Sequence, residues 1–375
     1  MKLSTPQRIL IVNPFGIGDI LFTTPVIRAL RRAFPKSWIG YLCNRRTERI
    51  LRNNPHLNEL FIYEKDEMIQ VWRDSPGRGL HVLAEFLHRI HQARIDLAVD
   101  LSLGERYGMI LQIIGVPKRI GFNFRNRGRF LTERLSIDGY QDYHVVEYYR
   151  KLLRFIGVEL LDPSTELHVS DEDKQWAEAQ LRQRNLASHR PLVGIVPAGG
   201  LSWGGGAFFR RWHCEGFAAV ADALVEQYNA AVILFGETPD CSTCATVSRL
   251  MHHPAVDLSG QTTLDQFVSL LGRLNLVICN DGGPLHLAVS QGVKTVSIFG
   301  PVDPQVYGPF STRPSSHRVV FREDLPCRPC YHRFKLPPCP YERACLTTIS
   351  PEEVLQACSP LLSESATPLF RPIDD

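Results

Sequence analysis

Residues 9–34 read ILIVNPFGIGDILFTTPVIRALRRAF, and this stretch decides the fold class. The apolar run 9–12 predicts a strand buried on both faces, as in a parallel sheet covered by helices. A turn with Gly16 and Gly18 follows, and Asp19 stands at the start of the next helix. Strand, glycine turn and helix open a nucleotide-binding βα unit, whose turn ordinarily offers backbone N–H groups to a phosphate. Because a carboxylate repels phosphate, either this turn does not hold the nucleotide or Asp19 takes part in the chemistry.

Short apolar runs alternate with helical periods through the first half of the chain. This alternation predicts an α/β domain with a doubly wound parallel sheet. The expected strands are 8–13, 38–43, 59–63, 97–101 and 119–121, and the expected helices are 19–34, 80–92 and 104–114.

A second α/β series follows a proline-containing, acidic stretch at 157–191. Five apolar runs end there at a Gly, Asp or Pro loop: PLVGIVPAGG, AAVILFGE, AVDLSG, LNLVICNDGGP and KTVSIFGP. Ligands of open parallel sheets bind at the carboxyl ends of the strands, so this half is expected to hold the larger ligand. A late helix is expected from the capping Ser350 through Cys358. The predicted organisation is an N-terminal domain 1–160, a connection 161–190, a C-terminal domain 191–362 with a Cys-rich segment 327–345, and a tail 363–375.

The composition is that of an ordinary globular protein, with 44% hydrophobic and 22% charged residues among 375. The first residues lack the apolar core of a signal peptide, and no run approaches the ~20 apolar residues that span a bilayer. We therefore predict a cytoplasmic protein, in which ten cysteines indicate free thiols or a metal rather than disulfides.

The net charge of +3 conceals an asymmetry between the two halves. Residues 1–160 carry 25 Lys and Arg against 16 Asp and Glu, whereas the remainder carries 17 against 23. This basic N-terminal half predicts an anionic partner, either a membrane surface contacted peripherally or a phosphorylated substrate; a solvated surface is the alternative. No nucleic-acid-binding motif accompanies the arginines, so nucleic acid is not expected.

Two loops of the C-terminal half carry residues suited to a nucleotide diphosphate. After the apolar strand that ends at Cys279, NDGGP at 280–284 leads into a helix whose N–H groups can bind phosphates. The second loop, PAGGLSWGGGAFFRRWHCEGF at 197–217, is rich in glycine and is expected to be mobile. The predicted donor-binding residues are Ser202, Arg210, Arg211, Glu237 (ribose hydroxyls), Asn280, Asp281, Gly282, Gly283 and His286. An ordinary βα turn, a surface Glu237 and a packed His286 are the structural alternatives.

These motifs together resemble glycosyltransferase family 9, the ADP-heptose:lipopolysaccharide heptosyltransferases. The resemblance extends from RILIVNPFGIGDILFTTPVIRALRRAFP through SWGGGAFFRRWH to NDGGPLHLAVSQGVKTVSIFGPVDPQVYGP. It implies a GT-B fold, with two facing Rossmann-like domains and a cleft between them. It also implies that Asp19 is the general base, that 280–286 binds the ADP part of the donor, and that Arg210 replaces a residue that is often Lys.

The implied activity is inverting transfer of heptose, or a similar sugar, from an ADP-sugar to a lipopolysaccharide core or related glycan. The N-terminal domain, with Gly16 and Gly18 on its turn, would hold the anionic lipid-linked acceptor. No cofactor is expected for catalysis, because no Mg²⁺-binding DxD-type cluster stands in the loops. A nucleotide-sugar 2-epimerase of the same fold and a non-catalytic nucleotide-binding module are the alternatives.

The segment CRPCYHRFKLPPCPYERAC places Cys327, Cys330, Cys339 and Cys345 close together in the chain. Four thiolates at such a spacing can converge on one tetrahedral ion, so we predict a structural Zn site. Two disulfides or four unligated thiols are the alternatives. Some family 9 relatives carry a cysteine-bound iron, and the resemblance therefore makes iron a second candidate.

Overall fold

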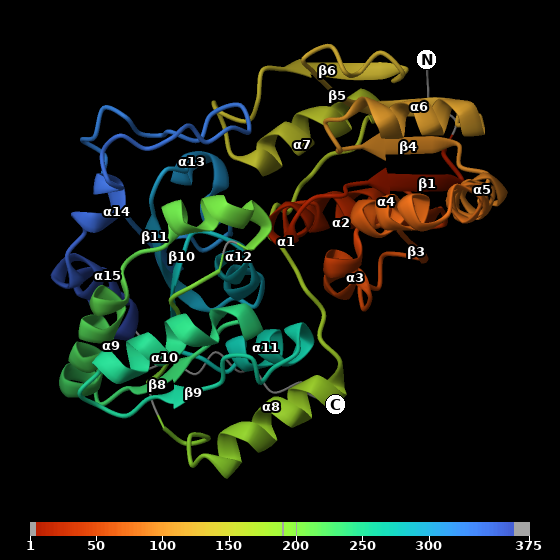
Figure 1. Cartoon of the computed structure of the whole chain (residues 1–375). Helices are drawn as coiled ribbons and strands as arrows, with labels where there is room; N and C mark the ends of the chain where they lie inside the picture. The colour runs from red at the N-terminus through yellow and green to blue at the C-terminus, as the bar shows by residue number, and fades with distance from the viewer. Residues whose placement is uncertain (1–4, 190, 200, 364–375) are drawn as a thin grey trace. The chain divides into compact units, whose positions relative to one another are not determined.

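The structure is a computed structural model that describes residues 5–189, 191–199 and 201–363. The chain divides into two compact units, which we call unit 1 (Met1–His168) and unit 2 (Val169–Asp375). In Figure 1, unit 1 runs from red to yellow-green and unit 2 from yellow-green to blue. Each unit contains one six-stranded sheet, and every strand pair in both sheets is parallel. Of the predicted tail, only Ser363 lies within the described residues.

The sheet of unit 1 has the strand order β3-β2-β1-β4-β5-β6. Its central strand β1 is RILIV, and four of these five residues are buried, as the apolar run predicts. The strands are β1 (Arg8–Val12), β2 (Trp38–Cys43), β3 (Glu59–Ile62), β4 (Leu97–Asp100), β5 (Lys118–Phe124) and β6 (Glu133–Ile137).

Helices α5 and α6 cover one face of this sheet, where Ile90 and Leu111 join Leu10, Val12 and Ala98 in one apolar core. On another part of the unit, α2 packs against α7. The helices of unit 1 are α1 (Ile17–Leu21), α2 (Thr24–Ala33), α3 (Arg45–Leu51), α4 (Lys65–Asp74), α5 (Pro76–Gln92), α6 (Glu105–Ile114) and α7 (Val145–Leu153), with a 3₁₀ turn at Arg154–Ile156.

The single helix expected over 19–34 is wrong, because the chain breaks there between α1 and α2. The hydroxyl of Thr23 donates to the Ile20 carbonyl oxygen over 2.7 Å, and that of Thr24 donates to the Leu21 carbonyl oxygen over 2.8 Å. Hydroxyls that bond to nearby carbonyls compete with the backbone ladder. Pro25, in the first turn of α2, has no N–H to continue the ladder of α1.

The sheet of unit 2 has the strand order β12-β11-β10-β7-β8-β9. Numbered within the unit, this is the same order as in unit 1 and the order of a dinucleotide-binding doubly wound fold. The five apolar runs expected in this half are all strands. The strands are β7 (Leu192–Val196), β8 (Ala231–Leu234), β9 (Val256–Asp257), β10 (Leu276–Asn280), β11 (Lys294–Phe299) and β12 (His317–Phe321).

Helices α9, α10 and α15 cover one face of the second sheet, where Phe217, Val247 and Val354 join the core. Ser350 and Glu353 cap α15 reciprocally, since each backbone N–H donates to the other side chain. The helices are α8 (Asp171–Gln183), α9 (Cys214–Tyr228), α10 (Cys241–Leu250), α11 (Leu264–Leu271), α12 (Gly283–Ser290), α13 (Pro304–Tyr307), α14 (Ala344–Thr347) and α15 (Pro351–Ser363), and the 3₁₀ helices are Leu201–Arg210, Thr238–Asp240 and Pro314–Ser316.

Helix α8 lies inside the segment predicted as a connection and packs against α11 of unit 2. Arg273, just beyond α11, forms an ion pair with Glu178 of α8. Across the described ranges, no helix is both long and apolar enough to cross a membrane.

The strand order reverses between β1 and β4 in unit 1 and between β7 and β10 in unit 2. In open α/β sheets a crevice opens at such a reversal, beyond the carboxyl ends of the strands, and ligands bind there. The predicted site residues follow β1 in unit 1 and β7, β8 and β10 in unit 2. Both sets therefore lie in the chain where the fold forms its ligand crevices.

Candidate active site

The carboxylate of Asp19 is held in place by the glycine turn that precedes it. The backbone N–H of Gly16 donates to Asp19 Oδ2 over 3.2 Å, which caps the short helix α1. From the end of β1, the side-chain amide of Asn13 donates to the Asp19 carbonyl oxygen over 3.3 Å. The side chain of Asp19 is half-buried, so it keeps access to solvent while its direction is fixed.

Three buried tyrosine hydroxyls lie in the electrostatic field of Asp19. Burial raises the pKa of Tyr41, Tyr140 and Tyr149, and the negative charge of Asp19 raises each of these pKa values further. The Tyr41 hydroxyl also lies 2.7 Å from Thr23 Oγ1. These phenols therefore stay neutral and add no negative charge to the surroundings of Asp19.

A second carboxyl group of unit 1, Asp100, was not singled out from the sequence. It ends β4 and stands opposite Val12 in the register of β1 and β4. Its Oδ1 accepts the backbone N–H of Ser102 over 2.9 Å, and burial raises the pKa of Asp100 to about 6. A single Asp at a strand end carries no signal in a sequence, so only the structure shows its complete burial.

In unit 2, Arg210 and Asp281 form a buried ion pair. Arg210 Nε lies 3.1 Å from Asp281 Oδ2, and Nη2 donates to the same oxygen. Burial raises the pKa of Asp281, and the Arg210 guanidinium opposes that shift. The other oxygen, Oδ1, is buried and has no hydrogen-bond partner among the described residues. Such an oxygen calls for an explanation, and a bound ligand that donates to it would supply one.

Arg211 and Asn280 tie together the loops that follow β7, β8 and β10. Arg211 Nε donates to the Gly199 carbonyl oxygen over 2.9 Å, and Nη2 lies 3.2 Å from the buried Asp240 carboxylate. Asn280 Oδ1 accepts the backbone N–H of Trp212 over 2.8 Å. The two neighbouring arginines thus fix loops as well as supplying charge, a role that the sequence did not reveal.

Helix α12 begins as the sequence predicted, directly after the glycine turn. Gly282 has a φ of +147°, a conformation that side chains rarely adopt, and Gly283 is the first helical residue. No side chain among the described residues caps this helix, so its first-turn N–H groups remain available to an anion. His286 lies within α12 and is buried, which agrees with the alternative that it is a packed helix residue.

The remaining predicted donor residues are Ser202, which lies in a 3₁₀ segment, and Glu237, which directly precedes another. The glycine-rich stretch expected to be a mobile loop contains a 3₁₀ helix over Leu201–Arg210, broken at Gly204. Ser202 belongs to this helix, but its side chain is outside the described ones. Glu237 is exposed and begins the turn Thr238–Asp240, and His213 caps α9 through its Nδ1, 2.8 Å from the Gly216 nitrogen.

The four clustered cysteines line one cavity of about 300 Å³. All ten cysteines of the chain are free thiols in the structure, so the disulfide alternative is not observed. Cys330 Sγ donates to the Cys327 carbonyl oxygen over 2.8 Å, and burial, with the neighbouring thiols, raises the pKa of Cys330 to about 11. Within the described ranges, no three His, Cys, Asp or Glu side chains are placed to hold an ion. The four thiols are not brought together around one point in this arrangement, so the structural metal site stays a prediction that rests on the spacing of the cysteines in the sequence and on the cavity that they share.

The metal prediction expects one equivalent of Zn or Fe in protein purified without chelator. Elemental analysis that finds less than about a tenth of an equivalent contradicts the prediction. A structural ion is bound tightly enough to stay with the protein through purification. Cys339→Ser should release the ion and lower the melting temperature. Cys241→Ser, a half-exposed thiol on α10, is the control and should do neither.

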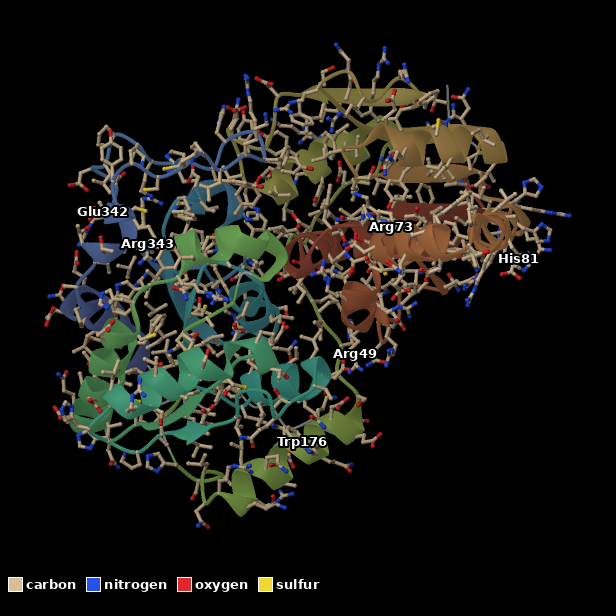
Figure 2. All side chains as sticks on the ribbon, viewed as in Figure 1. Arg49, Arg73, His81, Trp176, Glu342 and Arg343 are labelled. Atoms are coloured by element: carbon tan, nitrogen blue, oxygen red, sulfur yellow. The ribbon has the colours of Figure 1, made fainter. Side chains whose placement is uncertain are left out.

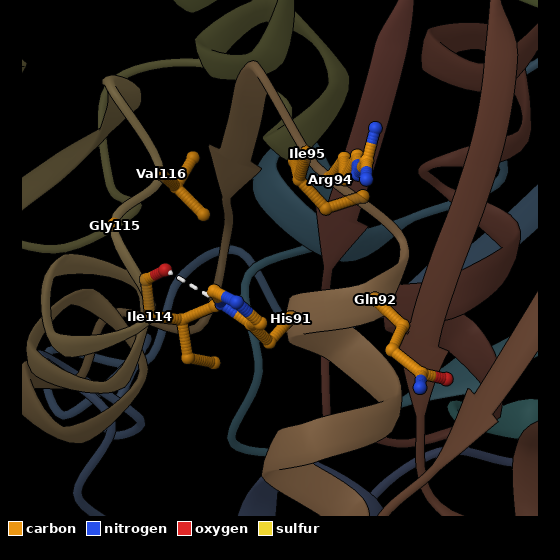
Figure 3. A pocket seen from close by; sticks show the side chains of 7 residues that line it. All are labelled: His91, Gln92, Arg94, Ile95, Ile114, Gly115 and Val116. Carbon is orange, nitrogen blue, oxygen red and sulfur yellow. Dashed lines mark hydrogen bonds between the residues drawn. The ribbon is translucent and has the colours of Figure 1, made fainter.

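A larger hollow of about 710 Å³ lies away from the predicted site residues (Figure 3). It is formed where α5 and α6 end, and His91 Nδ1 lies 3.2 Å from the Ile114 carbonyl oxygen across it. Arg94 and Val116 line it just before β4 and β5 begin. Ligands of such sheets bind at the opposite, carboxyl ends, so size alone does not make this hollow the candidate site.

Comparison with known proteins agrees with these features. The sequence profile of glycosyltransferase family 9 (heptosyltransferase) matches residues 83–338. Lipopolysaccharide heptosyltransferase 2 of Escherichia coli K12 is 24% identical over 328 residues, which cover 84% of this chain and 88% of that protein.

Two solved structures are similar over almost the whole chain. The glycosyl transferase family 9 protein of Veillonella parvula has a TM-score of 0.80 at 25% identity, covering 97% of this chain and 99% of that one. The E. coli ADP-heptose lps heptosyltransferase II has a TM-score of 0.73 at 22% identity, covering 96% and 100%. The predicted GT-B class, with two Rossmann-like doubly wound domains, is confirmed. The chain belongs to glycosyltransferase family 9, the heptosyltransferases, and is a glycosyltransferase enzyme.

Proposed function

We propose that this enzyme transfers heptose from ADP-heptose to a sugar of a lipopolysaccharide core. Family membership and the names of relatives that match most of the chain support this substrate pair. The observation that carries the proposal is the half-buried Asp19 carboxylate, fixed on the glycine turn after β1. A group so placed suits proton abstraction better than phosphate binding.

Unit 2 is proposed to bind the ADP part of the donor. The uncapped N-terminus of α12 offers N–H groups and a favourable dipole to the diphosphate. The buried Asp281 Oδ1 is free to accept a hydrogen bond from a hydroxyl of the donor. Arg211 and the exposed Glu237, which follows β8, complete the proposed set, and the proposed role of Glu237 is to bind the ribose hydroxyls. Nε and Nη2 of Arg210 both bond to the Asp281 carboxylate. Its proposed hydrogen bond to phosphate therefore comes from the other N–H groups of the guanidinium.

Unit 1 is proposed to bind the acceptor and to supply the base. The acceptor hydroxyl oxygen attacks the anomeric carbon of the heptose as the bond from that carbon to the ADP oxygen breaks. The hydroxyl proton passes to the Asp19 carboxylate, and ADP leaves with the bonding electron pair. The N–H groups of α12 stabilise the charge that develops on the diphosphate. One displacement at the anomeric carbon inverts its configuration.

Two other functions remain as alternatives from the sequence. A nucleotide-sugar 2-epimerase would convert the donor without an acceptor. A non-catalytic nucleotide-binding module would bind the donor and turn nothing over. Neither has a specific use for Asp19 as a base toward an acceptor hydroxyl.

A donor screen by thermal shift, followed by a turnover assay, tests the proposal. ADP-heptose should raise the melting temperature more than UDP- or GDP-sugars, since a ligand at 100 times its Kd stabilises the folded state by about 2.7 kcal/mol. Addition of a heptose-deficient lipopolysaccharide core should then release ADP in step with glycan growth. Epimer formation without acceptor, or binding without turnover, would instead support one of the two alternatives.

A further inference from the structure

Arg343, near the end of the Cys-rich segment, has a strained backbone. Its φ is +60° and that of Glu342 is +47°, a left-handed region that residues with side chains rarely adopt. The backbone N–H of Arg343 donates to Cys339 Sγ over 3.4 Å, and its carbonyl oxygen accepts the N–H of Leu346 over 2.7 Å. Strain of this kind persists where surrounding contacts enforce it, and it is concentrated at functional sites. The contacts of the Arg343 side chain therefore call for a functional explanation.

The Arg343 side chain bonds to the backbone on both sides of Arg210. Its Nη1 donates to the Phe208 carbonyl oxygen over 3.1 Å and to the Arg211 carbonyl oxygen over 3.0 Å. The guanidinium carbon also lies 3.7 Å from the centre of the Phe208 ring. Figure 2 shows Arg343 where the chain enters α14, beside the 3₁₀ helix that carries Arg210. One side chain thus fixes the backbone before and after Arg210.

The backbone around Arg210 gains from support outside its own helix. Three consecutive glycines at 204–206 precede it, and glycine has the most conformational freedom to lose on folding. The side chain of Phe208 is 58% exposed, so it is not anchored in a core. The last carbonyl groups of a helix have no partner within that helix, and a basic side chain can satisfy them. Arg343 supplies this support from a distant part of the chain.

Arg328, at the other end of the Cys-rich segment, fixes a second loop beside the candidate site. Its Nε donates to the Gly300 carbonyl oxygen over 2.6 Å, and its Nη2 donates to the Val302 carbonyl oxygen over 3.0 Å. This loop follows β11, the strand that pairs with β10. Burial raises the pKa of Asp281, and the positive charges of Arg210 and Arg328 oppose that shift. The Cys-rich segment is therefore attached at both ends to loops around the Arg210–Asp281 pair.

We propose that Arg343 is a positioning residue for the donor site and acts through Arg210. By holding the backbone on both sides of Arg210, it directs the guanidinium of Arg210 toward Asp281 and the diphosphate together. Groups that bind a ligand must be held to within about 0.5 Å of their working geometry, and neighbouring residues do this. The inference rests on the proposed function, because it takes the diphosphate of ADP to be the group that Arg210 binds. It needs no ion in the Cys-rich segment.

The contacts of Arg343 favour positioning over direct binding of the nucleotide. Both acceptors of its Nη1 are carbonyl oxygens of the protein, and its guanidinium lies over the ring of Phe208. A direct phosphate ligand would have to give up these contacts. The Arg343 guanidinium is therefore assigned to the backbone, and that of Arg210 to the ligand.

The test measures binding of ADP to the full chain by calorimetry. Arg343→Ala should weaken ADP binding about tenfold, because a misplacement of about 1 Å at a binding group can cost up to about 100-fold. Arg343→Lys should recover part of this loss, since an ammonium group can still donate to one of the two carbonyls. Lys335→Ala is the matched control. It removes an exposed positive charge from the same segment and should bind ADP like the wild type.

A double-variant cycle separates positioning from direct contact. In the Arg210→Ala/Asp281→Asn background, Arg343→Ala should change the affinity for ADP little, because the group that it positions is already absent. Amide hydrogen exchange at 208–211, measured without nucleotide, should be faster in Arg343→Ala than in the wild type. A merely structural role would lower the melting temperature and leave the affinity of the folded protein for ADP unchanged.

The inference is overturned if Arg343→Ala binds ADP as tightly as the wild type does. It is also overturned if Arg343→Ala weakens ADP binding equally in the background that lacks Arg210, or if Lys335→Ala has the same effect. If Arg343→Ala does not fold, Arg343→Lys decides: weaker ADP binding supports the inference and wild-type affinity overturns it. Failure of the wild type to bind ADP would defeat the proposed function, whereas wild-type binding without an effect of Arg343→Ala defeats this inference alone.

Discussion

Replacing Asp19 with asparagine is expected to lower turnover about 10²–10⁴-fold, the usual contribution of one general base, and to leave donor affinity nearly unchanged. Asparagine keeps the size of the side chain and can still accept the Gly16 N–H that caps α1. It cannot take the proton of the acceptor hydroxyl. Initial rates of ADP release with acceptor present, together with calorimetric binding of ADP-heptose, measure the two effects separately.

Asp100→Asn is the matched control for Asp19→Asn. It removes another carboxyl group at this end of the sheet, on the strand next to β1. A turnover close to wild type is expected for this variant. Loss of turnover in Asp100→Asn with retention in Asp19→Asn would transfer the role of base to Asp100.

Arg210→Ala is expected to have the largest effect on stability. It leaves the Asp281 carboxyl buried without its partner, and breaking a buried pair in this way costs about 3–5 kcal/mol. Donor affinity should also fall, by roughly 1.5–3 kcal/mol if the guanidinium bonds to phosphate. Chemical denaturation and calorimetry with ADP measure the two losses.

Two companion variants separate the causes of these losses. Adding Asp281→Asn to Arg210→Ala removes the orphaned charge and should recover much of the stability without recovering donor affinity. Arg211→Ala breaks a more exposed pair with Asp240 and should destabilise less. If Arg210→Ala unfolds at the wild-type denaturant concentration, the ion pair does not stabilise unit 2.

Most of the strands that the sequence predicts have buried, uninterrupted apolar runs, and the exceptions are the edge strands β3 and β9. The strands it misses, β6 and β12, lie at the edges of the two sheets. β6 reads ERLSI and has no fully buried residue. Its alternation of apolar and polar residues is short, and its two charged residues are as typical of a loop as of a strand. Helix α4 was missed for a related reason, because no residue in it faces a core.

The loops that carry the candidate site could be chosen from the sequence, but the contacts within them could not. Arg210 and Asp281 were each assigned to the donor, although they stand 71 positions apart and bond to one another. That pairing depends on how β7 and β10 are placed in the sheet. The helical form of Leu201–Arg210 was hidden by its glycines, which favour mobile loops in general.

The division of the chain into two separate sheets has a consequence for how the protein unfolds. The two sheets have no strand in common, and each unit is built around its own sheet and core. Chains of this kind depart from two-state behaviour, so one melting temperature is not a complete description of them. A nucleotide bound to unit 2 raises the midpoint temperature at which unit 2 unfolds. Unit 1, which does not bind the nucleotide, then unfolds cooperatively at its own, unchanged temperature.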